Sequence, residues 1–179
     1  MLYVKAQSLI WEMDTAKKYE IPVGMCSWED LKEGEFFAEM EDFYTQYQPK
    51  KEVITRIATL LRLANDPKGT FLGQFAEVTV YFGAWCGDSK EHLPAFIKIC
   101  EMLQNEEQVI MPYTLVGCNR AKEHGLPAQE FDFEIKLVPT FVFQYWDTTN
   151  TKQTLGTIIE TPHVTIEEDI EAILNLLIK

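Results

Sequence analysis

The chain has 179 residues, of which 46% are hydrophobic and 25% charged, so it is long enough to form one globular domain, or one domain with an appended segment. Its formal net charge of −12 excludes nucleic acid and anionic membrane surfaces as expected partners, since positive patches bind both. The apolar runs are shorter than the roughly 18 to 20 residues of a membrane helix, and the first residues lack the apolar core of a signal peptide. We therefore expect a soluble cytoplasmic protein that does not bind membranes.

The spacing of apolar residues in the first third of the chain predicts helices. Two apolar stripes at helical spacing lie between Ser27 and Ala64, on either side of a break at Gln48-Pro49, and "NDPKG" (residues 65–69) ends the second. We interpret residues 1–69 as an N-terminal helical extension. The stripes consist of Phe36, Phe37, Met40, Phe43, Tyr44 and Tyr47, and of Val53, Ile54, Ile57, Leu60 and Leu61.

The remainder, residues 70–179, has the pattern of an α/β domain. Short runs rich in β-branched and aromatic residues predict strands over 77–85, 109–117 and 140–146, and a polar turn joins the third to a hairpin partner, "QTLGTIIE". A helix over about 86–103 connects the first two strands, which predicts a parallel pair. A short helix or loop is expected near residues 128–133, and a capping box of Thr165 and Glu168 begins the last helix. Pro112 suits an edge position for the second strand.

The four cysteines, Cys26, Cys86, Cys100 and Cys118, have no C-x-x-C spacing, so we expect free thiols. Cys100 falls on the apolar face of the helix over 86–103, which indicates core packing. Cys86, His92 and Cys100 fit no tight metal-ligand spacing. The sequence therefore predicts no metal site and no cofactor.

Cys86 lies where the first strand gives way to this helix. Unpaired N–H groups and the positive end of the dipole at a helix N-terminus favour a thiolate, the nucleophilic form of cysteine. Ser89, one turn on, is placed to donate a hydrogen bond to the sulfur, and Lys90 adds positive charge. Asp88 opposes the thiolate, and we expect it to pair with His92 on the helix surface.

The stretch "WCGDSK" (residues 85–90) resembles the thioredoxin superfamily, whose motif is Trp-Cys-Gly-Pro-Cys-Lys. Pro94 matches the proline that kinks the family's second helix, and Pro139, in "VPT", matches its cis-proline, which faces the reactive cysteine. The resemblance covers about residues 70–179 and implies a central mixed sheet flanked by helices. It also implies that substrate docks at the motif and beside the cis-proline, that is, on Trp85, Gly87, Val138 and Pro139.

The departures from the family pattern are consistent with one another. Ser89 replaces the resolving cysteine, Asp88 replaces the motif's proline, and Val80 stands where typical thioredoxins keep a buried carboxylate that helps to deprotonate the second thiol. Without a resolving thiol in the motif, dithiol reductase activity is not expected. Cys118 ends the second strand and is a candidate resolving thiol if it lies within about 4.4 to 6.8 Å of Cys86, Cα to Cα.

Two functions follow from this resemblance. The first is a monothiol oxidoreductase, in which Cys86 and Ser89 act on a disulfide-containing protein or a low-molecular-weight thiol through a mixed disulfide. Asp88, Lys90 and Cys118 are then possible modulators. The alternative is a non-catalytic protein-binding module with the same fold. An iron–sulfur role like that of monothiol glutaredoxins ranks last, because "TFVFQYWDTTN" replaces the glycine-rich turn that holds glutathione in those proteins. The sequence does not indicate an oligomeric state.

Overall fold

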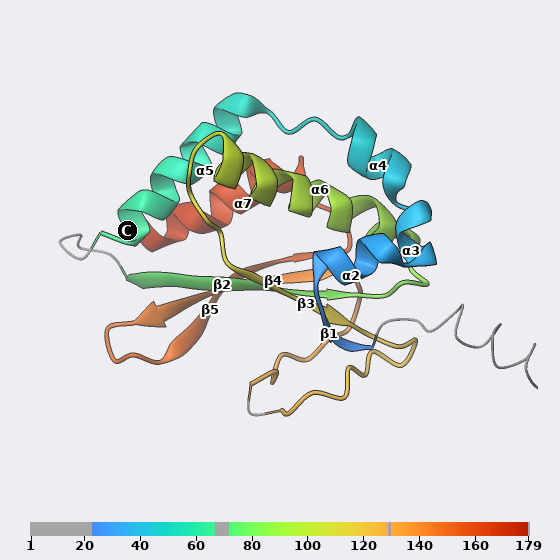
Figure 1. Ribbon diagram of the computed structural model, residues 1–179. Coiled ribbons are helices and arrows are strands. Elements are labelled where there is room, and N and C mark those ends of the chain that lie inside the picture. The colour runs from blue at the N-terminus through green and yellow to red at the C-terminus, as the bar shows by residue number, and fades with distance from the viewer. Residues whose placement is uncertain (1–22, 67–71, 129, 179) are drawn as a thin grey trace, which may run out of the picture.

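A computed structural model describes residues 23–66, 72–128 and 130–178 and has a mixed α/β architecture (Figure 1). Its sheet has five strands in the order β1-β3-β2-β4-β5. The central pair β2 and β3 is parallel, and the other neighbours are antiparallel. The predicted parallel pair and the predicted hairpin are therefore confirmed. The strands are β1 (Gly24–Cys26), β2 (Gly73–Phe82), β3 (Tyr113–Gly117), β4 (Thr140–Asp147) and β5 (Lys152–Ile159).

The helices begin and end at recognisable signals. Ser27 caps the first helix through a reciprocal bond with Asp30, and Thr165 caps the last by accepting from the Glu168 N–H. The helical stretch before Pro49 is three short helices rather than one, with a first interruption at Gly34. The helices are α2 (Trp28–Glu33), α3 (Glu35–Ala38), α4 (Glu41–Gln46), α5 (Lys51–Ala64), α6 (Gly87–Asn105) and α7 (Ile166–Leu174), followed by the 3₁₀ turn η1 (Asn175–Ile178).

The described helices cover one face of the sheet, where Figure 1 shows α5, α6 and α7 side by side. Residues of α5 such as Ile57 share this core with Phe82 of β2 and Phe96 of α6. The boundary that we predicted at residue 69 thus falls between elements that contribute to one hydrophobic core. None of the helices in the described ranges is long and apolar enough to cross a membrane.

The opposite face of the sheet is covered by the segment between β3 and β4. Its side chains pack on Tyr81, Val116 and Val142, which alternate along their strands with residues of the helical face. Phe131 and Phe133 belong to this cover, and no helix forms in the described part of residues 118–139. The predicted mixed sheet flanked by helices is therefore confirmed, with the helices on one face and, of the short helix or loop expected near residues 128–133, the irregular alternative on the other.

Two strand predictions require correction. The segment interpreted as a helical extension contains β1, which pairs with β3 through Cys26 and Leu115. Because β1 occupies the sheet edge, β3 lies inside the sheet, so Pro112 does not mark an edge strand. Pro112 immediately precedes β3, and its carbonyl accepts a hydrogen bond from the Val78 N–H at 2.9 Å. A proline before a strand removes no ladder donor from it.

Candidate functional site

The end of β2 places Cys86 at the start of α6. The strand stops at Phe82, a short turn follows, and Cys86 is the N-cap residue of the helix, with extended backbone dihedrals. The Cys86 N–H donates to the Gly83 carbonyl at 2.9 Å, and the Cys86 carbonyl accepts from the Lys90 N–H at 3.2 Å. Cys86 is half-buried. The structure confirms the predicted junction and leaves this cysteine partly accessible.

The segment "VPT" lies beside Cys86 in the structure, although Val138 is 52 residues later in the sequence. The Val138–Pro139 peptide bond is cis, as the resemblance implied. The Cys86 thiol donates to the Val138 carbonyl oxygen, with 3.1 Å between sulfur and oxygen. Val138 and Pro139 are both buried. The strand-helix junction and the approach to β4 thus form one site.

The sulfur of Cys86 does not cap its own helix. No hydrogen bond joins the Cys86 side chain to the first-turn N–H groups, and the sulfur is turned toward Val138 instead. Only the protonated sulfur donates this bond, so formation of a thiolate must release the Val138 carbonyl. Beyond Cys86, a Cβ built on Gly87 would meet nothing within 4 Å. The helix start is therefore open on that side.

Ser89 supports the turn before the cysteine. Its side chain is fully buried, and its hydroxyl oxygen accepts a hydrogen bond from the Gly83 N–H at 3.2 Å. Among the described residues no hydrogen bond links Ser89 to the Cys86 sulfur, contrary to the sequence-based expectation. We conclude that Ser89 fixes the segment that delivers Cys86 to the helix.

The charged neighbours of Cys86 also differ from expectation. Lys90 forms an ion pair with Glu39, the residue after α3, rather than with the cysteine. Asp88 is half-buried in the first turn. His92 is buried, 8% exposed, so the predicted surface pair between Asp88 and His92 is wrong.

Trp85 forms one wall of the site. A Cβ added to Gly83 would lie 2.7 Å from its ring, which explains the glycine at that position. The indole Nε1–H donates to the Cys118 carbonyl at 3.2 Å. The Arg120 guanidinium and the Lys122 ammonium lie 5.2 and 6.0 Å from the centre of the Trp85 ring. Two cations therefore adjoin the indole beside Cys86.

Sequence reasoning missed Arg120 and Lys122, although a signal was present. Both follow β3, and the carboxyl ends of parallel strands meet at the same edge of a sheet. Since β2 ends just before Trp85, residues that follow β3 lie close to it. The alternation of Phe131, Phe133 and Ile135 likewise marks the cover of the second face, with a period of two.

The other cysteines are poor nucleophiles. Burial raises the pKa of the Cys118 thiol to about 11, and Cys118 is fully buried in the same cluster as Cys86 and Val138. Burial, with a smaller contribution from the Asp30 carboxylate, also raises the pKa of Cys26 to about 11. For Cys100, burial raises the pKa well above its ordinary value. Both burial and the raised pKa of Cys118 oppose its acting as a resolving thiol.

Metal binding has no support in the described ranges. These residues include no group of three or more His, Cys, Asp or Glu side chains that could hold a metal ion.

Comparisons with known proteins identify no family for this chain. No family model matches the sequence, and no curated protein matches it. Among solved structures, the chain is similar to a protein of unknown function from Pseudomonas aeruginosa, determined at 1.5 Å. The identity is 18%, the TM-score is 0.37, and the match covers 85% of this chain and 97% of that one.

Proposed function

We propose that this protein is a thioredoxin-like thiol–disulfide oxidoreductase of monothiol type, acting in the cytoplasm. The observation that carries the proposal is the half-buried Cys86 thiol at the start of α6, 3.1 Å from the Val138 carbonyl. The thioredoxin resemblance expects a reactive cysteine in this position, beside its cis-proline.

The proposed reaction has two exchange steps. The Cys86 thiolate attacks one sulfur of a substrate disulfide, so that the Cys86–substrate bond forms, the substrate disulfide breaks and the released thiolate takes up a proton. An external thiol then attacks the mixed disulfide, bonds to the substrate sulfur and frees Cys86. Because Cys118 is fully buried, with a pKa of about 11, we assign the second step to this external thiol.

Within the site, the proposal gives each neighbouring residue a role. Trp85 and the Val138 backbone form the docking face for the substrate chain on either side of the sulfur. Ser89 is a positioning residue, since its hydroxyl fixes Gly83 and thereby the turn that ends at Cys86. Val80 is fully buried in β2, and a monothiol exchange needs no carboxylate there.

The test is formation of a mixed disulfide at a single cysteine. The intact protein is incubated with glutathione disulfide at neutral pH, and adducts are located by peptide mass spectrometry. Cys26→Ser is the matched control, because Cys26 is also half-buried. We expect one adduct in the parent protein and in Cys26→Ser, and none in Cys86→Ser. An adduct spread over several cysteines, or no adduct at Cys86, refutes the proposal and favours a non-catalytic binding module.

A further inference from the structure

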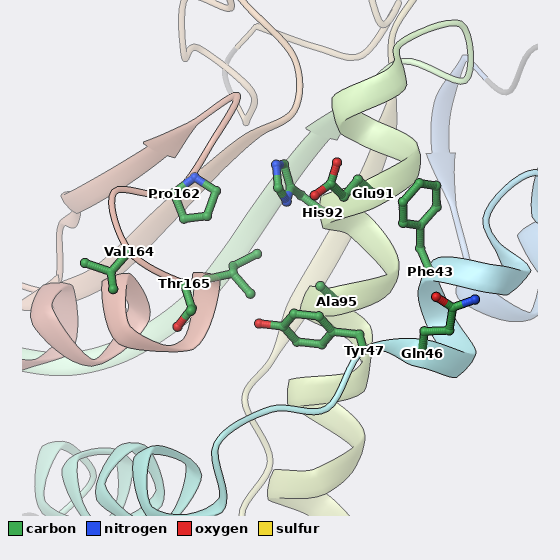
Figure 2. Close-up of a pocket in the computed structure, with 10 residues that line it drawn as sticks. Phe43, Gln46, Tyr47, Glu91, His92, Ala95, Pro162, Val164 and Thr165 are labelled. Carbon is green, nitrogen blue, oxygen red and sulfur yellow. The ribbon is translucent and has the colours of Figure 1, made fainter.

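A cavity of about 340 Å³ lies between α4, α6 and the segment that enters α7 (Figure 2). Its volume is at the lower end of the roughly 300 to 1,000 Å³ range of small-molecule sites. Part of its wall is apolar, and the polar lining includes two consecutive residues of α6. The apolar part of the wall consists of Phe43, Ala95, Pro162 and Val164, and the two consecutive residues of α6 are Glu91 and His92.

His92, which lines this cavity, has a ring nitrogen that makes no hydrogen bond among the described residues. The residue is 8% exposed, and this nitrogen, Nε2, is buried. Buried polar atoms of folded proteins nearly always have a partner, so an unpaired one needs an explanation. Nothing in the proposed chemistry of Cys86 uses this imidazole. His92 therefore indicates a second site on α6, two turns beyond the cysteine.

The carboxylate that lines the cavity is that of Glu91, and the nearby Glu168 carboxylate is already paired with the Lys50 ammonium at 3.0 Å. The hydroxyls of Tyr47 and Thr165, which also line the cavity, donate to the carboxylates of Glu167 and Glu168. None of the described residues that line the cavity is Lys or Arg. An anionic ligand would meet repulsion here, whereas a cation would find the Glu91 carboxylate.

We infer that the cavity binds a compact aromatic or alicyclic primary amine. Its ring fills the space between Phe43, Ala95 and Val164, and its ammonium group lies toward Glu91. Val164 is 69% exposed and Phe43 44% exposed, so the ring covers apolar surface that is otherwise in contact with water. This binding requires no participation of Cys86.

Three probes of similar size and different charge test the inference: benzylamine, benzyl alcohol and benzoate. They are titrated into the intact protein while the three histidine rings are observed by NMR. We expect saturable shifts at His92 with benzylamine, a dissociation constant of about 1 mM for so small a ligand, weaker binding of the alcohol and the weakest binding of benzoate. His124 is the internal control, because it packs near Tyr81 on the other face of the sheet.

Two variants decide whether the cavity is the site. Ala95→Leu fills the cavity and should abolish the His92 shifts. Glu91→Gln, an exposed substitution, should reduce benzylamine affinity severalfold without changing that of benzyl alcohol. Glu33→Gln, which changes the same charge on an exposed residue of α2, should change neither. The inference is overturned by absence of saturable binding, by benzoate binding as tightly as benzylamine, by binding that survives Ala95→Leu, or by a Glu91→Gln variant that binds benzylamine like the parent.

Discussion

Replacing Ser89 with alanine separates a structural role from a direct role in thiol chemistry. The Ser89 hydroxyl is fully buried and accepts from the Gly83 N–H at 3.2 Å, so Ser89→Ala leaves a buried donor without a partner. Such a loss costs about 1 to 3 kcal/mol of unfolding free energy. For a chain of this length, about 2 kcal/mol corresponds to a decrease in Tm of roughly 4 to 8 °C. The alkylation rate of folded Cys86 should stay close to that of the parent, because Ser89 makes no hydrogen bond to the sulfur.

The assay pairs urea unfolding with iodoacetamide labelling of Cys86 in the folded protein. Thr59→Ala, an exposed substitution in the interior of α5, is the control and should change stability by no more than about 0.5 kcal/mol. The reasoning is refuted if Ser89→Ala unfolds like the parent while its Cys86 is labelled much more slowly. That pattern would show that Ser89 donates a hydrogen bond to the Cys86 thiolate, as the sequence had predicted.

Three further predictions follow from other contacts. Ser89→Cys should confer or strengthen insulin-disulfide reduction by giving Cys86 a resolving partner, and unchanged activity would show that the lack of a second thiol does not limit turnover. Tyr47→Phe should lower the unfolding free energy by about 1 to 3 kcal/mol, measured in urea, because it removes the phenol that donates to buried Glu167; a neutral effect contradicts this account. Hydrogen bonds from the β4–β5 turn hold the pKa of Asp147 at about 2, below its ordinary 3.8, so its stabilising contribution is complete above pH 4 and is lost as the pH falls through 2. Asp147→Asn should therefore speed amide exchange in the turn at pH 6 and have little effect near pH 2, and equal effects at both pH values would refute the assignment.

Local signals in the sequence predicted much of the fold. The β-branched run that ends before Trp85, the helix start at Thr165 and the break at Pro49 each depend on neighbouring residues, and the structure confirms all three. The predicted capping box is only half formed, because the Glu168 carboxylate accepts from the Thr165 hydroxyl rather than from the Thr165 N–H. The strand β1 was not predicted because it has only three residues and forms through pairing with β3. A pattern confined to three residues carries no useful periodicity.

The candidate site was predicted where the motif itself fixes the geometry. Cys86 at the helix start followed from the strand and helix patterns, and the cis-proline Pro139 followed from the resemblance. The partners of Ser89 and Lys90 did not, because spacing along a helix identifies neighbours in the same helix but not a turn or a separate helix that packs beside it. The buried position of His92 was missed for the same reason, since α4 and the segment before α7 cover that face of α6.

The central claim is that Cys86 is the reactive thiol of this protein. The most direct measurement is the rate of iodoacetamide alkylation of each cysteine in the folded protein at pH 7, followed by peptide mass spectrometry, with N-acetylcysteine under the same conditions as the reference. The account predicts that Cys86 reacts several times faster than the reference, whereas Cys26, Cys100 and Cys118 react more slowly, in keeping with their raised pKa values. A Cys86 rate no faster than that of N-acetylcysteine would contradict it.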